Sequence, residues 1–224
     1  MRSKLLIIVL LLKLSDLSGQ VPVHQEPRHH PVFQNEAIRI LNVLLPPGDT
    51  SEYHVHTTPS LFIRLSGTVT GSQLQGGKAA SGKSVAGTLL FENLAPPHIR
   101  THRVWNADAD TFHVMDVELL FKDSGFAQSP LISTGLTLEI DTPWVRAYRL
   151  NLLNGTDFLP ENRNKPFMLI SFDAASVQIK QNGNTKTLAL KAGSFIEIKS
   201  KRSFSLKNVS GKTVQFVLLE FPVQ

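Results

Sequence analysis

The sequence of 224 residues contains no cysteine. The chain therefore cannot form disulfides, cannot bind a metal through thiolates and cannot use a cysteine nucleophile. Its fold must be held by a hydrophobic core or by a metal bound through nitrogen and oxygen ligands. Hydrophobic residues make up 42% of the chain, which is enough for a globular core and argues against disorder.

The start of the chain lacks an apolar run long enough to cross a membrane. The run Leu5–Leu12 spans eight residues and Lys13 ends it, whereas a membrane-spanning helix needs about 20. Basic residues precede the run, and small or polar residues follow it around Gly19, which is the pattern of a signal peptide. We therefore expect residues 1–19 to be removed and the mature protein to be secreted or periplasmic.

The sequence also lacks a large net charge and a segment in which basic and aromatic residues are interleaved. The formal net charge is only +5, and the densest basic group near the C-terminus has no interleaved aromatic residues. We expect no nucleic-acid partner and, once the leader is removed, no membrane partner. The histidines His24, His29 and His30 lie in a polar segment, residues 20–35, that we expect to be a solvated N-terminal arm.

No long helical stripe is present, and turn residues separate short segments rich in β-branched and aromatic residues. This pattern predicts an all-β sandwich or barrel. The Gly-, Ser- and Lys-rich stretch 66–87 is predicted to be a long, mobile hairpin end rather than a phosphate loop, because the spacing and the following helix are absent. The strand candidates are residues 37–45, 60–66, 111–121, 144–153, 167–172 and 213–221.

The two halves of the chain repeat each other. When they are aligned, Gly48 lies opposite Gly155 and Asn106 lies opposite Asn208. Each half therefore looks like one complete β unit. The Gly-, Ser- and Pro-containing stretch 122–130 suits a connector, so we expect domains at residues 36–125 and 131–224.

His54 and His56 are separated by one residue inside a predicted strand. Residues two apart on a strand share a face, so both imidazoles can approach one ion at about 2.0 to 2.1 Å. A third ligand must come from another part of the chain.

The spacing around this pair resembles the first motif of the cupin superfamily, in which a glycine, His-x-His, a glutamate and a second glycine follow at fixed intervals. Every interval fits, and only the glutamate is missing. The matching positions are Gly48, His54, His56, Ser60 and Gly67. The family's second motif is matched by Pro97, His102 and Asn106, with Phe91 and Ile99 at two positions where the family has glycine.

The resemblance covers nearly the whole mature chain and implies two cupin-type barrels in tandem, each a double-stranded β-helix or jelly roll. It implies that His54, His56 and His102 converge in the first barrel, while Asn106 is a structural residue in a turn. Some cupins, including the thiol dioxygenases, hold iron with three histidines and no carboxylate. Three imidazoles suit Fe, Zn, Cu, Ni or Mn better than Mg or Ca.

Two further residues could assist such a site. Glu52 has the strand parity of the histidine pair and would face the same interior if the strand begins that early. A charged residue at the mouth of the strand is the simpler interpretation of Glu52. Ser60 could hold a metal-bound water through its hydroxyl, or could serve only as a small packing residue.

The second half lacks the ligand set. The positions that match the first-barrel histidines and Ser60 hold Glu161, Arg163, Phe204 and Phe167. A phenylalanine where a ligand histidine is expected predicts a filled barrel. We therefore expect this half to be a scaffold or a partner-forming domain, and a homodimer is the assembly to consider.

Two functions remain open on the sequence alone. One is an exported metal-dependent enzyme, of the dioxygenase or isomerase type, that acts on a small organic molecule. The other is a non-catalytic bicupin that has lost its metal and binds a small ligand such as a sugar or an acid. The intact histidines favour the first, and the missing glutamate favours the second.

Overall fold

The computed structural model describes residues 21–122, 124–160, 166–199 and 204–222. The expected signal peptide lies outside these residues, as do Glu161 and Arg163. Strands form nearly all of the regular structure, and η1 (Val23–Gln25) is the one helical turn in the described part. No helix in these ranges has the length and apolar character that a membrane crossing requires.

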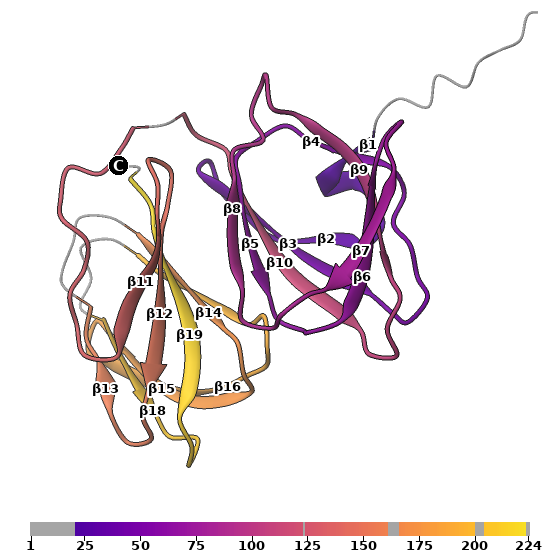
Figure 1. Ribbon diagram of the computed structural model, residues 1–224. Coiled ribbons are helices and arrows are strands. Elements are labelled where there is room, and N and C mark those ends of the chain that lie inside the picture. The colour runs from indigo at the N-terminus through magenta and orange to yellow at the C-terminus, as the bar shows by residue number, and fades with distance from the viewer. Residues whose placement is uncertain (1–20, 123, 161–165, 200–203, 223–224) are drawn as a thin grey trace, which may run out of the picture.

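The first half folds into a barrel of two facing sheets (Figure 1). One sheet has the order β1 (Val21–Pro22), β4 (His54–His56), β9 (Arg100–Asn106), β6 (Val69–Leu74), β7 (Ala79–Lys83). The other has the order β2 (His29–Gln34), β3 (Ile38–Leu45), β10 (Phe112–Leu119), β5 (Ser60–Arg64), β8 (Leu89–Glu92).

The second half repeats this arrangement. One sheet has the order β11 (Leu136–Asp141), β12 (Arg146–Leu152), β19 (Val214–Glu220), β14 (Phe167–Ser171), β17 (Phe195–Ile198). The other has the order β13 (Asp157–Phe158), β18 (Phe204–Asn208), β15 (Ala175–Gln181), β16 (Asn184–Leu190). The strand order therefore matches that of the first barrel throughout, except that β1 has no counterpart. The predicted all-β class, with two barrels in tandem, is confirmed.

One asparagine holds the same turn together in each barrel. The Asn106 side chain donates to the carbonyls of Leu45 and Asp110, at 2.9 and 2.7 Å. Asn208 donates to the carbonyls of Leu152 and Lys212, at 2.8 and 2.7 Å. The internal repeat thus preserves the contacts as well as the residue, and Asn106 has the structural role expected of it.

The glycines of the repeat lie next to these asparagines. Gly48 and Gly155 have φ values of +75° and +78°, a conformation that favours glycine. Each donates its N–H to the carbonyl of the asparagine in its own barrel, at 3.1 Å for Gly48 and 2.8 Å for Gly155. In both barrels this hydrogen bond therefore links the glycine that begins the first motif to the asparagine that ends the second.

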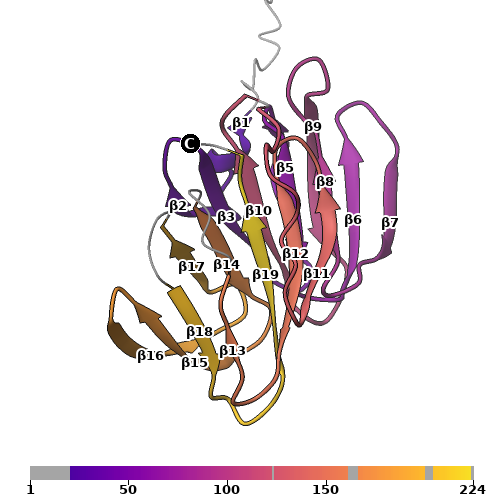
Figure 2. The same ribbon diagram turned by 90° about the vertical axis from the view of Figure 1, so that its left-hand side faces the viewer.

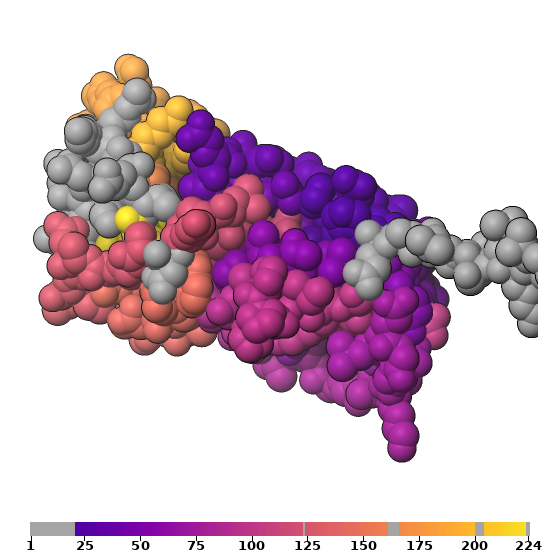
Figure 3. All heavy atoms as spheres, turned by 90° about the horizontal axis from the view of Figure 1, so that it is seen from above, coloured from indigo at the N-terminus to yellow at the C-terminus, as the bar shows by residue number. Residues whose placement is uncertain are grey.

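An apolar layer joins the barrels, which lie side by side (Figures 2 and 3). Alternate residues of β10, including Met115 and Val117, point into this layer, where they meet residues of β12, β14 and β19 such as Met168 and Leu219. At its edge Phe91 stacks on Trp144 with ring centroids 5.7 Å apart. Because the layer is continuous and apolar, the two barrels form one hydrophobic unit.

The six predicted strands coincide with β3, β5, β10, β12, β14 and β19. The stretch 66–87 is a hairpin, as expected, but half of it is the regular strand pair β6 and β7. Residues 21–34, which we expected to precede the barrel as an arm, contribute a strand to each of its sheets through β1 and β2.

The paired asparagines lead to a stability prediction. Replacing Asn106 or Asn208 by alanine removes the side-chain donor to one buried and one part-buried carbonyl, so each change should lower the free energy of unfolding by about 1 to 3 kcal/mol. Denaturant unfolding of the metal-free protein measures this effect. The exposed Asn184, changed to alanine, is the control and should shift stability by less than about 0.5 kcal/mol. Equal effects at Asn184 and Asn106 would contradict the structural role.

Candidate metal centre

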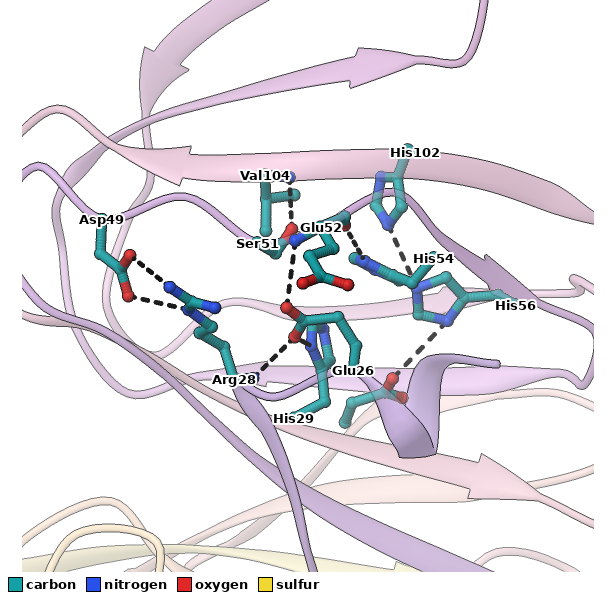
Figure 4. A network of polar contacts seen from close by, with 11 residues as sticks. Glu26, Arg28, His29, Asp49, Ser51, Glu52, His54, His56, His102 and Val104 are labelled. Atoms are coloured by element: carbon teal, nitrogen blue, oxygen red, sulfur yellow. Dashed lines mark hydrogen bonds and ion pairs between the residues drawn. The ribbon is translucent and has the colours of Figure 1, made fainter. Parts of the chain in front are cut away.

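The three motif histidines meet on the inner face of the first barrel (Figure 4). His54 and His56 alternate along β4 and are 0% and 2% exposed. His102 on β9 pairs directly with His54 in the strand register. One ligand atom from each lies within 4.8 Å of the other two, and the described residues contain no other such group of histidines and carboxylates.

The ring nitrogens are oriented for a shared ligand. His54 Nδ1 donates to the Glu52 carbonyl at 2.9 Å, which leaves the buried Nε2 without a hydrogen-bond partner in the described structure. The Nε2 atoms of His56 and His102 are 3.1 Å apart. Two nitrogens bound to one ion at about 2.1 Å each would be separated by about 3 Å. The separation of the His56 and His102 nitrogens therefore matches that of two ligands of one metal ion.

The environment keeps these imidazoles neutral. Burial, reinforced by His29, lowers the pKa of His54 to about 4. Burial, with the neighbouring His54 and Arg100, lowers the pKa of His102 to about 3. Burial also lowers the pKa of His56 well below the ordinary value. A neutral imidazole presents the lone pair that a metal needs.

Asp116 on β10 is a fully buried carboxyl beside the cluster. Its Oδ2 is 3.7 Å from His56 Nδ1, and neither carboxyl oxygen has a hydrogen bond of ordinary geometry in the described structure. Burial raises its pKa well above the ordinary value, with Glu118 adding to the rise and the Ser60 hydroxyl opposing it. Asp116 therefore lies where a carboxyl can orient the ring of a ligand histidine.

The two accessory candidates from the sequence have different positions. Ser60 is fully buried on β5, close to Asp116 and on the inner face. The side chain of Glu52 is exposed, and its contribution comes from its backbone, which contacts His54 and Glu26. Ser60 is thus a buried neighbour of Asp116, and the Glu52 carboxylate is not part of the cluster of ligand atoms.

Two buried residues beside the cluster were not identified from sequence. His29 is 5% exposed, so the expectation of a solvated histidine is wrong at this position, and its ring centroid is 4.4 Å from that of His54. Its Nδ1 is 2.5 Å from Glu26 Oε2. Burial opposes ionisation of Glu26, but hydrogen bonds from His29 and from two backbone N–H groups lower its pKa.

The signal for Asp116 was present in the sequence. On β10, Phe112, Val114 and Asp116 share one strand face, and all three line the interior. A carboxylate on the inner face of an otherwise apolar strand is costly unless it has a function or a partner. No comparable pattern marks His29 or Glu26, because short polar segments rarely reveal whether they are buried.

His56 and His102, together with His29, line a cavity of about 510 Å³ between the two sheets of the first barrel. Its walls combine apolar side chains, such as Phe62 and Val104, with the cations Arg64, Lys83 and Arg100. This volume is in the range of pockets that bind small organic molecules.

The second barrel has the same architecture with a filled interior. The strand registers place His29, Ser60, Ser72, His102 and Asp116 at the positions of Leu136, Phe167, Ile179, Phe204 and Leu218. These apolar residues belong to the core of the second barrel or pack in its sheets, and Phe167 and Phe204 are buried in it as predicted. One fold thus carries a polar cavity in one copy and an apolar core in the other.

Comparisons with known proteins identify the fold. No family model matches the sequence, and neither does any curated protein. AerE from Microcystis aeruginosa superposes with a TM-score of 0.61 at 12% identity, covering 88% of this chain and 98% of AerE. Salicylate 1,2-dioxygenase from Pseudoaminobacter salicylatoxidans, solved as adducts with gentisate, gives a TM-score of 0.60 at 12% identity, covering 85% and 70%. At this identity the likeness establishes the fold, which is that of tandem cupin-type barrels.

The lowered histidine pKa values determine how stability depends on pH. The folded values of His54 and His102 lie below the ordinary 6.5, so the unfolded chain binds more protons than the native one. Their stabilisation is therefore fully present above about pH 6.5 and is lost as the pH falls towards about 4. Asp116 acts in the opposite direction, because its raised pKa makes the native state the one that holds the proton.

We expect the free energy of unfolding of the metal-free protein to fall as the pH is lowered from about 7 to about 4.5. Changing His102 to phenylalanine, the residue at the equivalent position of the second barrel, should make this dependence shallower by about one proton, or about 1.4 kcal/mol per pH unit. Urea unfolding across the pH series measures both slopes. An unchanged slope in the His102→Phe variant would contradict the assignment.

Proposed function

We propose that this protein is an exported, metal-dependent cupin that acts on a small organic acid in dioxygenase-like chemistry. The observation that carries the proposal is the convergence of three neutral imidazoles, two buried and one half-buried, beside a sizeable cavity. The fold shared with a salicylate dioxygenase supports it. A divalent transition metal, when bound by His54, His56 and His102, supplies Lewis acidity and, if it is iron, the ability to activate dioxygen.

The chain itself provides the holding and orienting groups. The Glu52 carbonyl fixes the tautomer of His54, so that Nε2 is the free ligand atom. Asp116 lies behind His56, on the side away from His102. Apolar residues such as Phe62 and Val114 line the cavity together with the polar groups.

The charges in the cavity favour an anionic substrate. Arg100 is neutralised by a bidentate ion pair with Glu92, at 2.5 and 2.8 Å. Arg64, on the inner face of β5, makes no side-chain hydrogen bond or ion pair with any residue that the structure describes. A guanidinium of this kind can bind a carboxylate through two parallel hydrogen bonds. We assign Arg64 as the anchor for the carboxylate of the substrate.

Export is supported by the leader pattern in residues 1–19. The second barrel, with its filled interior, supports the first through the shared apolar layer. Any chemistry is therefore assigned to the first barrel.

Metal binding is tested by elemental analysis of the mature protein after loading. We expect one first-row transition-metal ion per chain, none in the His56→Ala variant, and a thermal midpoint that rises with metal only in the unmutated protein. The exposed His98, changed to alanine, is the matched control and should retain the metal. If the unmutated protein binds no metal, or if His56→Ala retains it, the alternative of a metal-free ligand-binding bicupin replaces this proposal.

The role of Arg64 is tested with a pair of probes that differ in charge alone. We expect the protein to bind benzoate more tightly than benzamide by about tenfold or more, which is typical of a charge-assisted contact. The Arg64→Met variant should lose this preference. Arg103, which stacks on Tyr53 and bonds Gln73 outside the cavity, is the control for removing an arginine. Calorimetric titration that shows equal binding of both probes would contradict the assignment.

A further inference from the structure

The carboxylate of Glu26 connects two of the imidazoles in the centre (Figure 4). One oxygen, Oε2, contacts His29 Nδ1 at 2.5 Å. The other, Oε1, accepts the backbone N–H of Glu52 at 3.1 Å. The carbonyl of Glu52 in turn accepts the Nδ1 proton of His54 at 2.9 Å. One carboxylate thus contacts His29 directly and His54 through a single residue of backbone.

The segment that carries Glu26 is joined to the ligand strand. β1 pairs in parallel with β4, with Val21 opposite His54. After the turn η1, β2 enters the other sheet of the barrel, with His29 opposite Val43. Residues 21–29 therefore bridge the two sheets at the end of the cavity where the histidines lie.

Glu26 is only 1% exposed although it carries a charged group, and a carboxylate is rarely buried to this extent unless it is paired. Its carboxylate makes three hydrogen bonds, with His29, with the N–H of Arg28 at 2.8 Å and with the N–H of Glu52. The second barrel gives an internal comparison, because the position of His29 is occupied there by Leu136, which packs against the apolar core. The polar pair occurs only in the barrel with the histidine cluster.

We propose that Glu26 is a positioning residue of the metal centre, which orients His54 through the Glu52 backbone and holds His29 as a fourth, non-ligating imidazole beside the ion. This inference rests on the proposed function, because it assigns an effect on metal affinity. Glu26 thereby supplies a negative charge close to the site, in a chain that has Ser60 where the family motif has glutamate. Hydrogen-bonded groups behind the ligands tune metal affinity by about 10- to 100-fold.

The test replaces Glu26 by glutamine, which preserves its shape but has a single acceptor oxygen. With that oxygen facing His29 and the N–H of Arg28, its NH2 group meets the N–H of Glu52. Zn²⁺ alone is the probe, and its dissociation constant is measured by competition with a chelating dye. We expect one Zn²⁺ per chain with affinity weakened by about 10- to 100-fold. Asp49→Asn is the matched control, because it removes the carboxylate partner of Arg28 in the same region without contacting an imidazole. The control should change the affinity by less than about threefold.

A second measurement tests the position of the imidazoles without any metal present. In the NMR spectrum of the metal-free protein, the hydrogen-bonded Nδ1 protons of His29 and His54 should give slowly exchanging signals. Glu26→Gln should shift the His54 signal, because the contact to the Glu52 backbone is lost, while a variant that is merely less stable but folded would leave both signals in place. If this variant keeps the Zn²⁺ affinity of the unmutated protein, or leaves the His54 signal unmoved, the inference is overturned.

The status of His29 is decided by changing it to leucine, the residue at the matching position of the second barrel. We expect this variant to keep one Zn²⁺ per chain. Loss of stoichiometric Zn²⁺ would make His29 a ligand and overturn the assignment of a non-ligating neighbour. If the unmutated protein takes up no Zn²⁺ at all, the proposed function fails, and the NMR signals alone decide whether Glu26 positions the imidazoles.

Discussion

Burial of both faces of the sheet β2-β3-β10-β5-β8 is the constraint on which the rest of the structure depends. The outer face of this sheet packs against the second barrel, and its inner face lines the cavity. On β10 the two environments alternate residue by residue, so that Met115 and Val117 meet the neighbouring barrel while Val114 and Asp116 face inwards. A one-residue slip of this strand would exchange the two sets, which fixes its register strongly.

The filled second barrel explains how the first can carry a polar cavity. Buried imidazoles and a buried carboxyl contribute little to stability or oppose it, because each loses its hydration. The core of the second barrel and the apolar layer between the barrels are assembled from aliphatic and aromatic side chains with no such penalty. Since the layer is shared, stabilisation of one barrel also supports the other.

The cluster could be predicted because its information is local. Alternation places His54 and His56 on one face, and the motif interval brings His102 opposite them, as the register shows. The strand pattern of the core and the repeat of Asn106 and Asn208 were equally accessible. The hairpin strands β6 and β7 were not, because their glycines and serines suggest a loop and only pairing with β9 makes them regular.

The surroundings of the cluster depended on contacts that no spacing rule encodes. Glu26 meets Glu52 across 26 residues, and His29 lies against His54 because β2 enters the opposite sheet. Polar residues in a short segment look solvated unless their partners are known. The charge of Asp116 on an inward-facing strand position was a usable signal, but its relation to His56 required the fold.

The exposed hairpin of β6 and β7 gives the cavity walls unequal stiffness. The wall formed by β5 and β10 is backed by the packed second barrel, so it cannot yield without disturbing a dense core. The opposite wall ends in β7, a strand whose residues are all exposed and which has one neighbour in the sheet. A bulkier occupant would therefore be accommodated by outward displacement of this hairpin, while the histidine end of the cavity keeps its shape.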